Sequence, residues 1–301
     1  MTAVKGVQPR IVRKMAGPYL TRACLQEGRT FRWFESLKQH PAPYLGAGEI
    51  ELVTGITRSV GQHVSLPNIP DEKSALWEPV QTPRLLCDDL FDSSQGKVLT
   101  LGETVRNLGV FLGLLHLCEI PENSLPLRLE PAWLQMDREA RKGISGALKG
   151  LPIEECPQLR ADADRMPVLS LRTFVHGRFS TGLVVSRGVF KVMGWREAGF
   201  GDPRVDVAYL LSEIVEAAAV ADLAVESGCS LIQGFLDGYR EACDPSLDLA
   251  YLESFVAERI LKHYAQSTWA FGENGQIGEI LHSVEQAWID LRPSFEASGH
   301  E

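Results

Sequence analysis

Apolar residues recur at helical spacing through most of the chain after residue 100. Within 104–118, Leu108, Phe111, Leu112 and Leu115 fall on one face of a helix, because a turn takes about 3.6 residues. This spacing predicts a long helix over 104–118. The same pattern predicts helical segments between proline breaks over 121–167, a helix that begins at residue 207, and four more helices over 218–227, 229–241, 248–270 and 276–291.

The first 90 residues differ, because short apolar runs and turn residues predominate there. Residues 10–15 and 19–25 flank a turn-forming Ala-Gly-Pro sequence, which predicts a β-hairpin. The stretch 29–39 has aromatic and aliphatic residues three positions apart, which predicts a helix. His63 is expected as a surface residue of a strand. Further strand-like runs span 49–53, 61–66 and 74–80.

The stretch 168–211 combines strand-like runs with a series of glycine, aspartate and histidine residues. It resembles the active-site core of the aminoglycoside phosphotransferase family, a branch of the kinase-like fold that includes choline and homoserine kinases. That core reads His-Gly-Asp, then Gly-Asn, then a strand that ends in Asp-Trp, then Gly-Asp-Pro and a further Asp. The positions that fit without gaps are His176, Gly177, Gly182, Trp195, Gly199, Gly201, Asp202, Pro203 and Asp206.

The resemblance implies an α+β, two-lobed protein-kinase-like fold with a reduced β-rich N-terminal lobe and a mainly helical C-terminal lobe. We expect the small lobe to span 1–83 and the large lobe, with the family core, to span 84–301. The resemblance is good from about residue 100 to 290 and weaker over 10–90.

The three family positions that carry the chemistry are altered. Arg178 stands where the family has its catalytic Asp, Leu183 where it has a metal-binding Asn, and Gly194 where it has a metal-binding Asp. Magnesium requires hard oxygen ligands, and an Arg cannot act as a general base near neutral pH. The resemblance therefore implies a degenerate, pseudokinase-like member with no catalytic residue and no metal site.

The family residues that hold the loop are kept. The resemblance implies that Asp206 accepts backbone hydrogen bonds from the catalytic loop, that Asp202 sets the turn before the next helix, and that His176 supports the same loop. Buried polar groups of this kind must be paired, so all three are read as structural.

The nucleotide side of the site also departs from the family. Arg22 is the best candidate for the position of the phosphate-binding Lys, and Glu27 is the nearest acidic residue to hold it. No glycine-rich phosphate loop precedes this strand. Arg178 and Arg22 are candidate contacts for an anion or nucleotide, because a guanidinium can bind phosphate or carboxylate through two hydrogen bonds. The alternative for Arg178 is that it points outward or pairs with Glu197.

Composition and charge narrow the classes of partner. The net charge is −9, yet residues 1–40 have 8 basic and 2 acidic side chains, while residues 200–301 have 18 acidic and 5 basic ones. An acidic chain argues against nucleic acid as a partner. The acidic half predicts a cationic small molecule or peptide there, with solvated helix faces as the alternative.

The chain reads as a cytoplasmic protein without a membrane partner. It has no apolar run long enough for a transmembrane helix and no secretory signal at its N-terminus. Its 6 cysteines are scattered, with no Cys-x-x-Cys pair, so reduced thiols are expected.

Three functions are compatible with these observations. The first is a pseudokinase that serves as a binding or adaptor module for a peptide or protein partner, similar to kinase-like components of bacterial natural-product tailoring pathways, and it needs no cofactor. The alternative is an active phosphotransferase that uses ATP and magnesium through a rewired metal site. A third reading is a subunit whose active site is completed by a partner.

Overall fold

The computed structural model describes most of the chain. The described residues are 9–17, 20–38, 44, 46–71, 73–92, 98–119, 149, 156–167, 173–185, 189–221, 223–243, 249–272 and 275–296.

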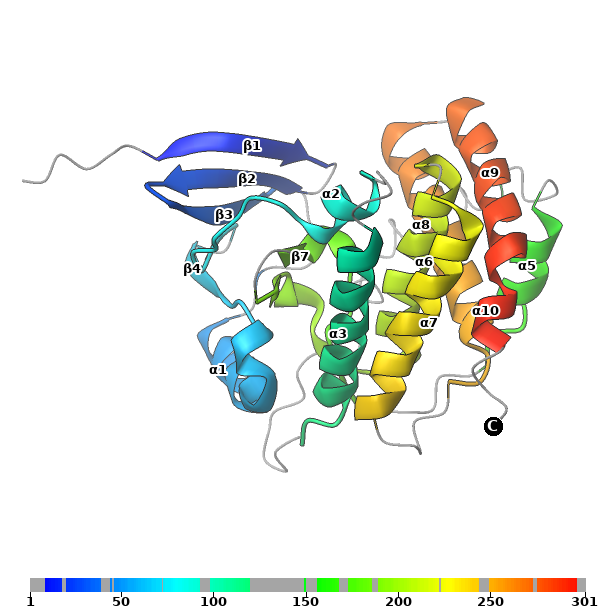
Figure 1. Ribbon diagram of the computed structural model, residues 1–301. Helices are drawn as coiled ribbons and strands as arrows, with labels where there is room; N and C mark the ends of the chain where they lie inside the picture. The colour runs from blue at the N-terminus through cyan, green and yellow to red at the C-terminus, as the bar shows by residue number, and fades with distance from the viewer. Residues whose placement is uncertain are drawn as a thin grey trace, which may run out of the picture.

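The N-terminal part is an antiparallel five-stranded sheet in the order β1-β2-β3-β5-β4, with β1 at its upper edge in Figure 1. The predicted hairpin is confirmed, since β1 and β2 pair from Arg10↔Gln26 to Ala16↔Thr21, and the strand predicted over 74–80 corresponds to β5. The strands are β1 (Arg10–Ala16), β2 (Leu20–Glu27), β3 (Thr30–Leu37), β4 (Pro67–Asp71) and β5 (Ser74–Trp77).

The helix predicted over 29–39 is wrong, because this stretch forms β3. It pairs with β2 in unbroken register from Glu27↔Thr30 to Leu20↔Leu37. Gly28 makes the tight turn between the two strands with a φ of 66°. Cross-strand pairing thus overrides the three-residue spacing of the aromatic side chains.

The strands predicted over 49–53 and 61–66 are also wrong. This segment forms α1 (Ala47–Ile56) followed by the 3-10 helix η1 (Thr57–His63). The Glu49 side chain accepts a hydrogen bond from the Gly46 backbone N–H at 2.7 Å and so caps the start of α1. The buried residues Val53, Ile56, Thr57 and Val60 follow helical spacing, which a short apolar run does not reveal by itself.

His63 is correspondingly not a strand residue. It ends η1, and its half-buried ring stacks on the ring of Phe190 with 4.1 Å between centroids. Burial lowers the pKa of His63, although the Phe190 carbonyl oxygen beside Nδ1 opposes that shift. His63 therefore packs η1 against Phe190.

The remainder of the described chain is mainly helical and forms the right-hand part of Figure 1. The helices predicted over 104–118, 229–241, 248–270 and 276–291 are confirmed with different ends, and so is the helix that begins near 207. The helix predicted over 218–227 is wrong: α6 ends at residue 220 and α7 begins at 225. Most of 121–167 lies outside the described residues. The helices are α2 (Leu86–Leu90), α3 (Val98–His116), α5 (Pro157–Ala163), α6 (Arg204–Val220), α7 (Val225–Ala242), α8 (Leu252–Phe271), α9 (Gly275–Leu291) and α10 (Pro293–Glu296).

Helices α3 and α7 lie side by side at the centre of the molecule, with their backbones in direct contact (Figure 1). Glycines permit this approach. A Cβ added at Gly109 would overlap the Phe235 carbonyl oxygen and lie 2.8 Å from the Tyr239 nitrogen, and one at Gly113 would lie 2.7 Å from the Tyr239 oxygen. This helix pair forms the centre of the helical part of the chain.

Gly109→Ala is expected to lower the free energy of unfolding by about 1–3 kcal/mol, since the added methyl forces two buried helices apart. Urea denaturation followed by circular dichroism measures this. Gly102→Ala is the matched control, because Gly102 lies on the same helix and a Cβ there would meet nothing within 4 Å. Equal loss of stability in the two variants would contradict the close approach of α3 and α7.

Candidate functional site

The segment 173–201, which resembles the kinase active site, contains two short antiparallel strand pairs. It leaves β6 (Thr173–Val175), runs through the 3-10 helix η4 (Thr181–Leu183) into β7 (Val184–Val185), and returns through β8 (Lys191–Val192), the 3-10 helix η5 (Trp195–Glu197) and β9 (Gly199–Gly201). Strand β6 pairs with β9, and β7 pairs with β8. These two pairings bring the beginning and the end of segment 173–201 together. We call this segment the loop.

Asp206, at the first turn of α6, anchors the start of this loop. Its Oδ2 accepts a hydrogen bond from the His176 backbone N–H at 2.6 Å, and the His116 Nε2 lies 3.4 Å from the same oxygen. The other ring nitrogen of His116 lies 2.8 Å from the Tyr239 hydroxyl. All of these side chains are buried, so Asp206 and His116 tie the loop to helices α3, α6 and α7.

The buried His176 ring is a strut between two segments of the loop. Burial lowers its pKa, which keeps the imidazole neutral although Asp206 opposes this shift. Its Nε2 lies 2.8 Å from the Met193 carbonyl oxygen and donates to it, while Nδ1 accepts from the Arg178 backbone N–H at 3.3 Å. Both ring nitrogens are thus engaged with the backbone, which leaves neither to move a proton.

Asp202 shapes the turn before α6. Its Oδ1 accepts from the Arg204 backbone N–H at 3.0 Å, and its two oxygens bind the Arg204 guanidinium at 2.9 and 2.6 Å. The same guanidinium lies over the ring of Phe255 and donates to the Ala250 carbonyl oxygen. The Asp202 carboxylate is thus paired within the protein, which agrees with the structural role expected for it.

The two altered metal positions contact one another. Gly194 has a φ of 86°, and a Cβ built on it would lie 2.7 Å from both methyl carbons of Leu183. Leu183 is buried and accepts a hydrogen bond from the Met193 backbone N–H at 2.9 Å. The leucine side chain therefore fills the space that an aspartate side chain at 194 would enter.

These residues do not fit a magnesium ion. Leu183 and Gly194 present hydrocarbon and hydrogen where oxygen ligands are required, and the guanidinium of Arg178 carries the same sign of charge as the ion. Among the residues that the structure describes, no three His, Cys, Asp or Glu side chains come together as a metal site.

Arg178 lies beside Glu197, which is the pairing that the sequence analysis gave as an alternative to an anion contact. Its side chain is 42% exposed. Its Nη1 is 3.7 Å from the Glu197 Oε1, and the buried Arg196 places its Nη2 at 3.7 Å from the same oxygen. One carboxylate thus faces two guanidinium groups without a hydrogen bond to either. Within the described part of the chain, Nε and Nη1 of Arg196 are buried without a hydrogen-bond partner.

Arg22 is bound by Glu35 of the neighbouring strand, so the sequence assignment of Glu27 as its partner is wrong. Arg22 Nε donates to Glu35 Oε1 at 2.6 Å, and its Nη2 forms an ion pair with the same oxygen. The Tyr44 hydroxyl lies 3.3 Å from the other oxygen of Glu35. Glu27 instead forms a half-exposed pair with Arg32. The antiparallel register, which sets Arg22 opposite Glu35, decides this choice.

Glu35 is only 2% exposed and still remains charged. Burial raises its pKa, but the positive charges of Arg22 and Arg196 lower it by more, so the net shift is downward. The same electrostatics appear in Tyr44, whose pKa is raised by burial and by the nearby Glu35 charge. Arg22, Glu35 and Arg196 therefore form a buried network of opposite charges.

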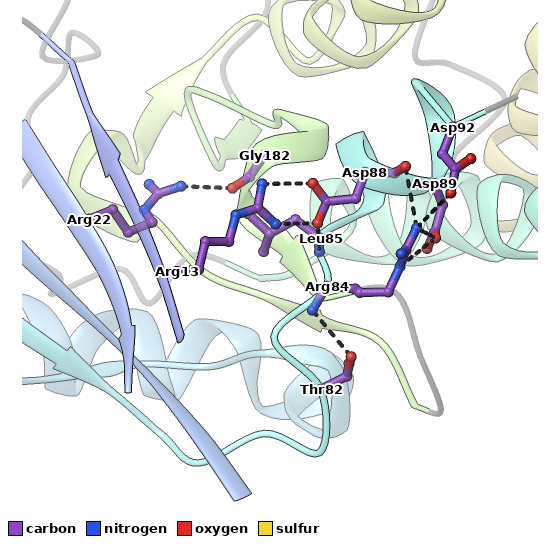
Figure 2. Close-up of polar contacts among 9 residues, drawn as sticks. All are labelled: Arg13, Arg22, Thr82, Arg84, Leu85, Asp88, Asp89, Asp92 and Gly182. Atoms are coloured by element: carbon purple, nitrogen blue, oxygen red, sulfur yellow. Dashed lines mark hydrogen bonds and ion pairs between the residues drawn. The ribbon is translucent and has the colours of Figure 1, made fainter. Parts of the chain in front are cut away.

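Two arginines connect the sheet directly to the helical part of the chain, as Figure 2 shows. Arg22 Nη1 donates to the Gly182 carbonyl oxygen at 2.7 Å. Arg13 binds both carboxylate oxygens of Asp88 on α2, with Nη2 at 2.6 Å from Oδ1. Asp88 also accepts from the Leu85 backbone N–H at 2.8 Å and so fixes the start of α2.

Glu213 is a site residue that the sequence analysis missed. Its oxygens accept hydrogen bonds from the Ser180 hydroxyl at 2.7 Å and from the Thr181 N–H and hydroxyl at 2.6 and 2.5 Å. It lies on α6 seven residues after Asp206, two helical turns along, and this spacing was the available signal. Glu35 and Arg196 were missed as well, and no local pattern marks them.

Comparison with known proteins gives the fold and no sequence family. No family model matches the chain, and no curated protein matches its sequence. An amicoumacin kinase in complex with AMP-PNP, Ca2+ and Ami matches at 14% identity and a TM-score of 0.58, over 94% of this chain and 88% of that one.

Two other solved structures agree. Choline kinase from Cryptosporidium parvum Iowa II matches at 10% identity and a TM-score of 0.56, over 99% of this chain and 92% of that one. A glucosamine kinase matches at 15% identity and a TM-score of 0.53, over 97% and 78%. The chain therefore has the two-lobed protein-kinase-like fold of these kinases.

Proposed function

We propose that the protein is a kinase-like binding or adaptor module that does not transfer phosphate. The observation that carries this proposal is the contact between Leu183 and Gly194, in which a leucine side chain fills the place of a metal-binding carboxylate. A merely weakened kinase would leave this space open to solvent and ions. Here the two substitutions complement each other in shape, as expected for a site that has been repacked.

The charge network supports the same proposal. Glu35 and the Gly182 oxygen engage all three guanidinium nitrogens of Arg22, so its charge is already paired within the protein and is not available to a nucleotide phosphate. Arg178 differs, because it and Arg196 share one carboxylate oxygen. We therefore keep Arg178, with Arg196 beside it, as the candidate residue for binding an anion. Arg22 is not kept as a candidate.

Isothermal titration calorimetry with ATP, in the presence and absence of magnesium, tests the proposal. We expect no magnesium-dependent binding at micromolar ATP, because the ion has no oxygen ligands and the phosphates meet a closed ion network. Magnesium-dependent binding with a micromolar Kd would instead support the alternative function, an ATP-dependent phosphotransferase with a rewired metal site.

Arg178→Asp is the matched variant for this titration. It returns the carboxylate of the catalytic position but neither metal ligand, so it is expected to bind no magnesium–ATP and to show no kinase activity. Turnover by this single variant would show that a metal is held by other residues and would overturn the proposal.

The partner remains a prediction. In the acidic half of the chain, the described residues Asp202, Asp206, Glu216 and Glu285 are buried, and Glu213 binds the loop. These carboxylates stabilise the fold, and only the exposed remainder is available to the cationic ligand expected from the sequence. No described helix combines the length and apolar character that crossing a membrane requires. The cytoplasmic location and the peptide-tailoring context likewise stay predictions.

A further inference from the structure

Strand β1 forms an open edge of the sheet. Within the described ranges it pairs with β2 alone, and its other edge lies along the outer boundary of the sheet (Figure 1). Such an edge presents unpaired backbone N–H and C=O groups that can pair with another extended chain. Ile11 is 58% exposed on this strand, so the edge also carries apolar surface.

The opposite edge of the same sheet is protected. Strand β4 contains Pro67 and Pro70, which have no N–H to donate to an added strand, and Asp71 follows them. Strand β1 contains no proline between Arg10 and Ala16. The two edges thus differ, and β1 is the edge without proline.

A hollow of about 540 Å³ lies between β1 and α2. The pairing of β1 with β2 shifts register between Ile11 and Arg13, which leaves Val12 as an extra residue beside the hollow. Phe91, at the end of α2, is 43% exposed and lines the same hollow. The apolar lining is completed by Pro83 and Cys87.

Ion pairs form the polar wall of this hollow, as Figure 2 shows. Arg13 binds Asp88, while Arg84 binds Asp89 at 2.6 Å and lies 3.5 Å from Asp92. The three carboxylates exceed the two guanidinium groups by one negative charge, so the hollow itself favours an apolar side chain over an acidic one.

The sheet around β1 is strongly basic. Residues 9–38 contain 7 basic and 2 acidic side chains in a chain of net charge −9. Arg10 and Lys14 on β1 are exposed. Like charges would oppose pairing of β1 with the β1 strand of a second copy, whereas an acidic strand would find opposite charges across the pair.

We propose that β1 and the adjoining hollow bind an extended acidic peptide segment of a partner protein by strand addition. The peptide backbone pairs with the open edge of β1, one apolar side chain enters the hollow beside Phe91, and flanking carboxylates face Arg10 and Lys14. Backbone hydrogen bonds supply affinity and the hollow supplies sequence preference. This surface is separate from the Leu183–Gly194 contact, so its test does not depend on whether the protein binds nucleotide.

An array of synthetic peptides with the length of β1 tests this proposal. Each peptide has a threonine background, a central Leu, Phe or Ser, and flanking Glu, Gln or Lys. We expect binding by Glu-flanked peptides with a Leu or Phe centre, and none by Lys-flanked or Ser-centred peptides. An array without any binder, or one in which Lys-flanked peptides bind best, would overturn the proposal.

Fluorescence anisotropy with the best binder then locates the site. Phe91→Glu and Lys14→Glu are expected to weaken binding at least about tenfold, which corresponds to about 1.4 kcal/mol. Ile289→Glu is the matched control, because Ile289 is 45% exposed on the distant helix α9 and should leave binding unchanged. Wild-type affinity in both β1-side variants would place the peptide elsewhere and contradict the proposal.

Two further measurements separate strand addition from other occupants. The peptide is N-methylated at one set of alternate amides or at the other. Methylation of the set that donates to β1 should abolish binding, and methylation of the set that faces away should not; unchanged affinity with both sets would contradict strand addition. Light scattering should show a monomer. A dimer that Phe91→Glu dissociates would show that a second copy, rather than an acidic peptide, occupies this edge.

Discussion

Gly194→Ala is expected to lower the free energy of unfolding by about 2–5 kcal/mol. Part of the loss is backbone strain, about 1–2 kcal/mol, because an L-residue is disfavoured at a φ of 86°. The rest is overpacking of about 1–3 kcal/mol, since the new Cβ would lie 2.7 Å from both Leu183 methyl carbons. Urea denaturation followed by tryptophan fluorescence measures the change.

A double-mutant cycle with Leu183→Ala separates the two causes. Leu183→Ala alone should cost about 2–4 kcal/mol through the cavity that it leaves. In the double variant the added methyl enters that cavity, so the combined loss should be smaller than the sum by about 1–3 kcal/mol. Gly28→Ala is the control for strain alone, because Gly28 has a φ of 66° and nothing within 4 Å of its added Cβ. Strict additivity would show that Leu183 does not fill the metal position.

Glu35→Gln is expected to lower the free energy of unfolding by about 3–5 kcal/mol, the usual loss when one partner of a buried ion pair is removed. The change leaves the Arg22 guanidinium without its carboxylate in the interior and removes the charge that faces Arg196. Because Arg22 also holds the Gly182 carbonyl oxygen, hydrogen exchange in η4 should accelerate as well.

Glu27→Gln is the matched control on the same sheet. Glu27 is 36% exposed and its nearest Arg32 nitrogen lies 3.3 Å away, so its loss should cost about 1 kcal/mol or less. Equal losses for Glu35→Gln and Glu27→Gln would contradict a buried charge network around Glu35. Such a result would also remove one of the two supports for a site that is closed to nucleotide.

Both predictions concern residues on which the proposed function rests. In that proposal the Leu183 side chain occupies the volume that a metal ligand at position 194 would enter, and Glu35 pairs with Arg22, the candidate for the family's phosphate-binding position. The two variants therefore measure how much these residues stabilise the fold, which the proposed binding role requires to be substantial.

The sequence by itself determined the kinase-like fold and which residue types stand at the family's catalytic and metal positions. The spacing from His176 to Asp206 is local, so the loop could be aligned without knowledge of tertiary contacts. The absence of oxygen donors at Leu183 and Gly194 is likewise a property of residue type alone. Long helices such as α3 were predictable because their apolar face repeats over several turns.

The tertiary structure alone decided the N-terminal lobe and the partners of its charges. The aromatic spacing of 30–37 is compatible with a helix until pairing with β2 makes it a strand, and that pairing sets Glu35, instead of the nearer Glu27, opposite Arg22. Contacts of this kind join residues that no periodic pattern connects, as do Arg22 with Gly182 and Arg13 with Asp88. Their energies depend on burial and on register across strands, and both quantities exist only once the chain has folded.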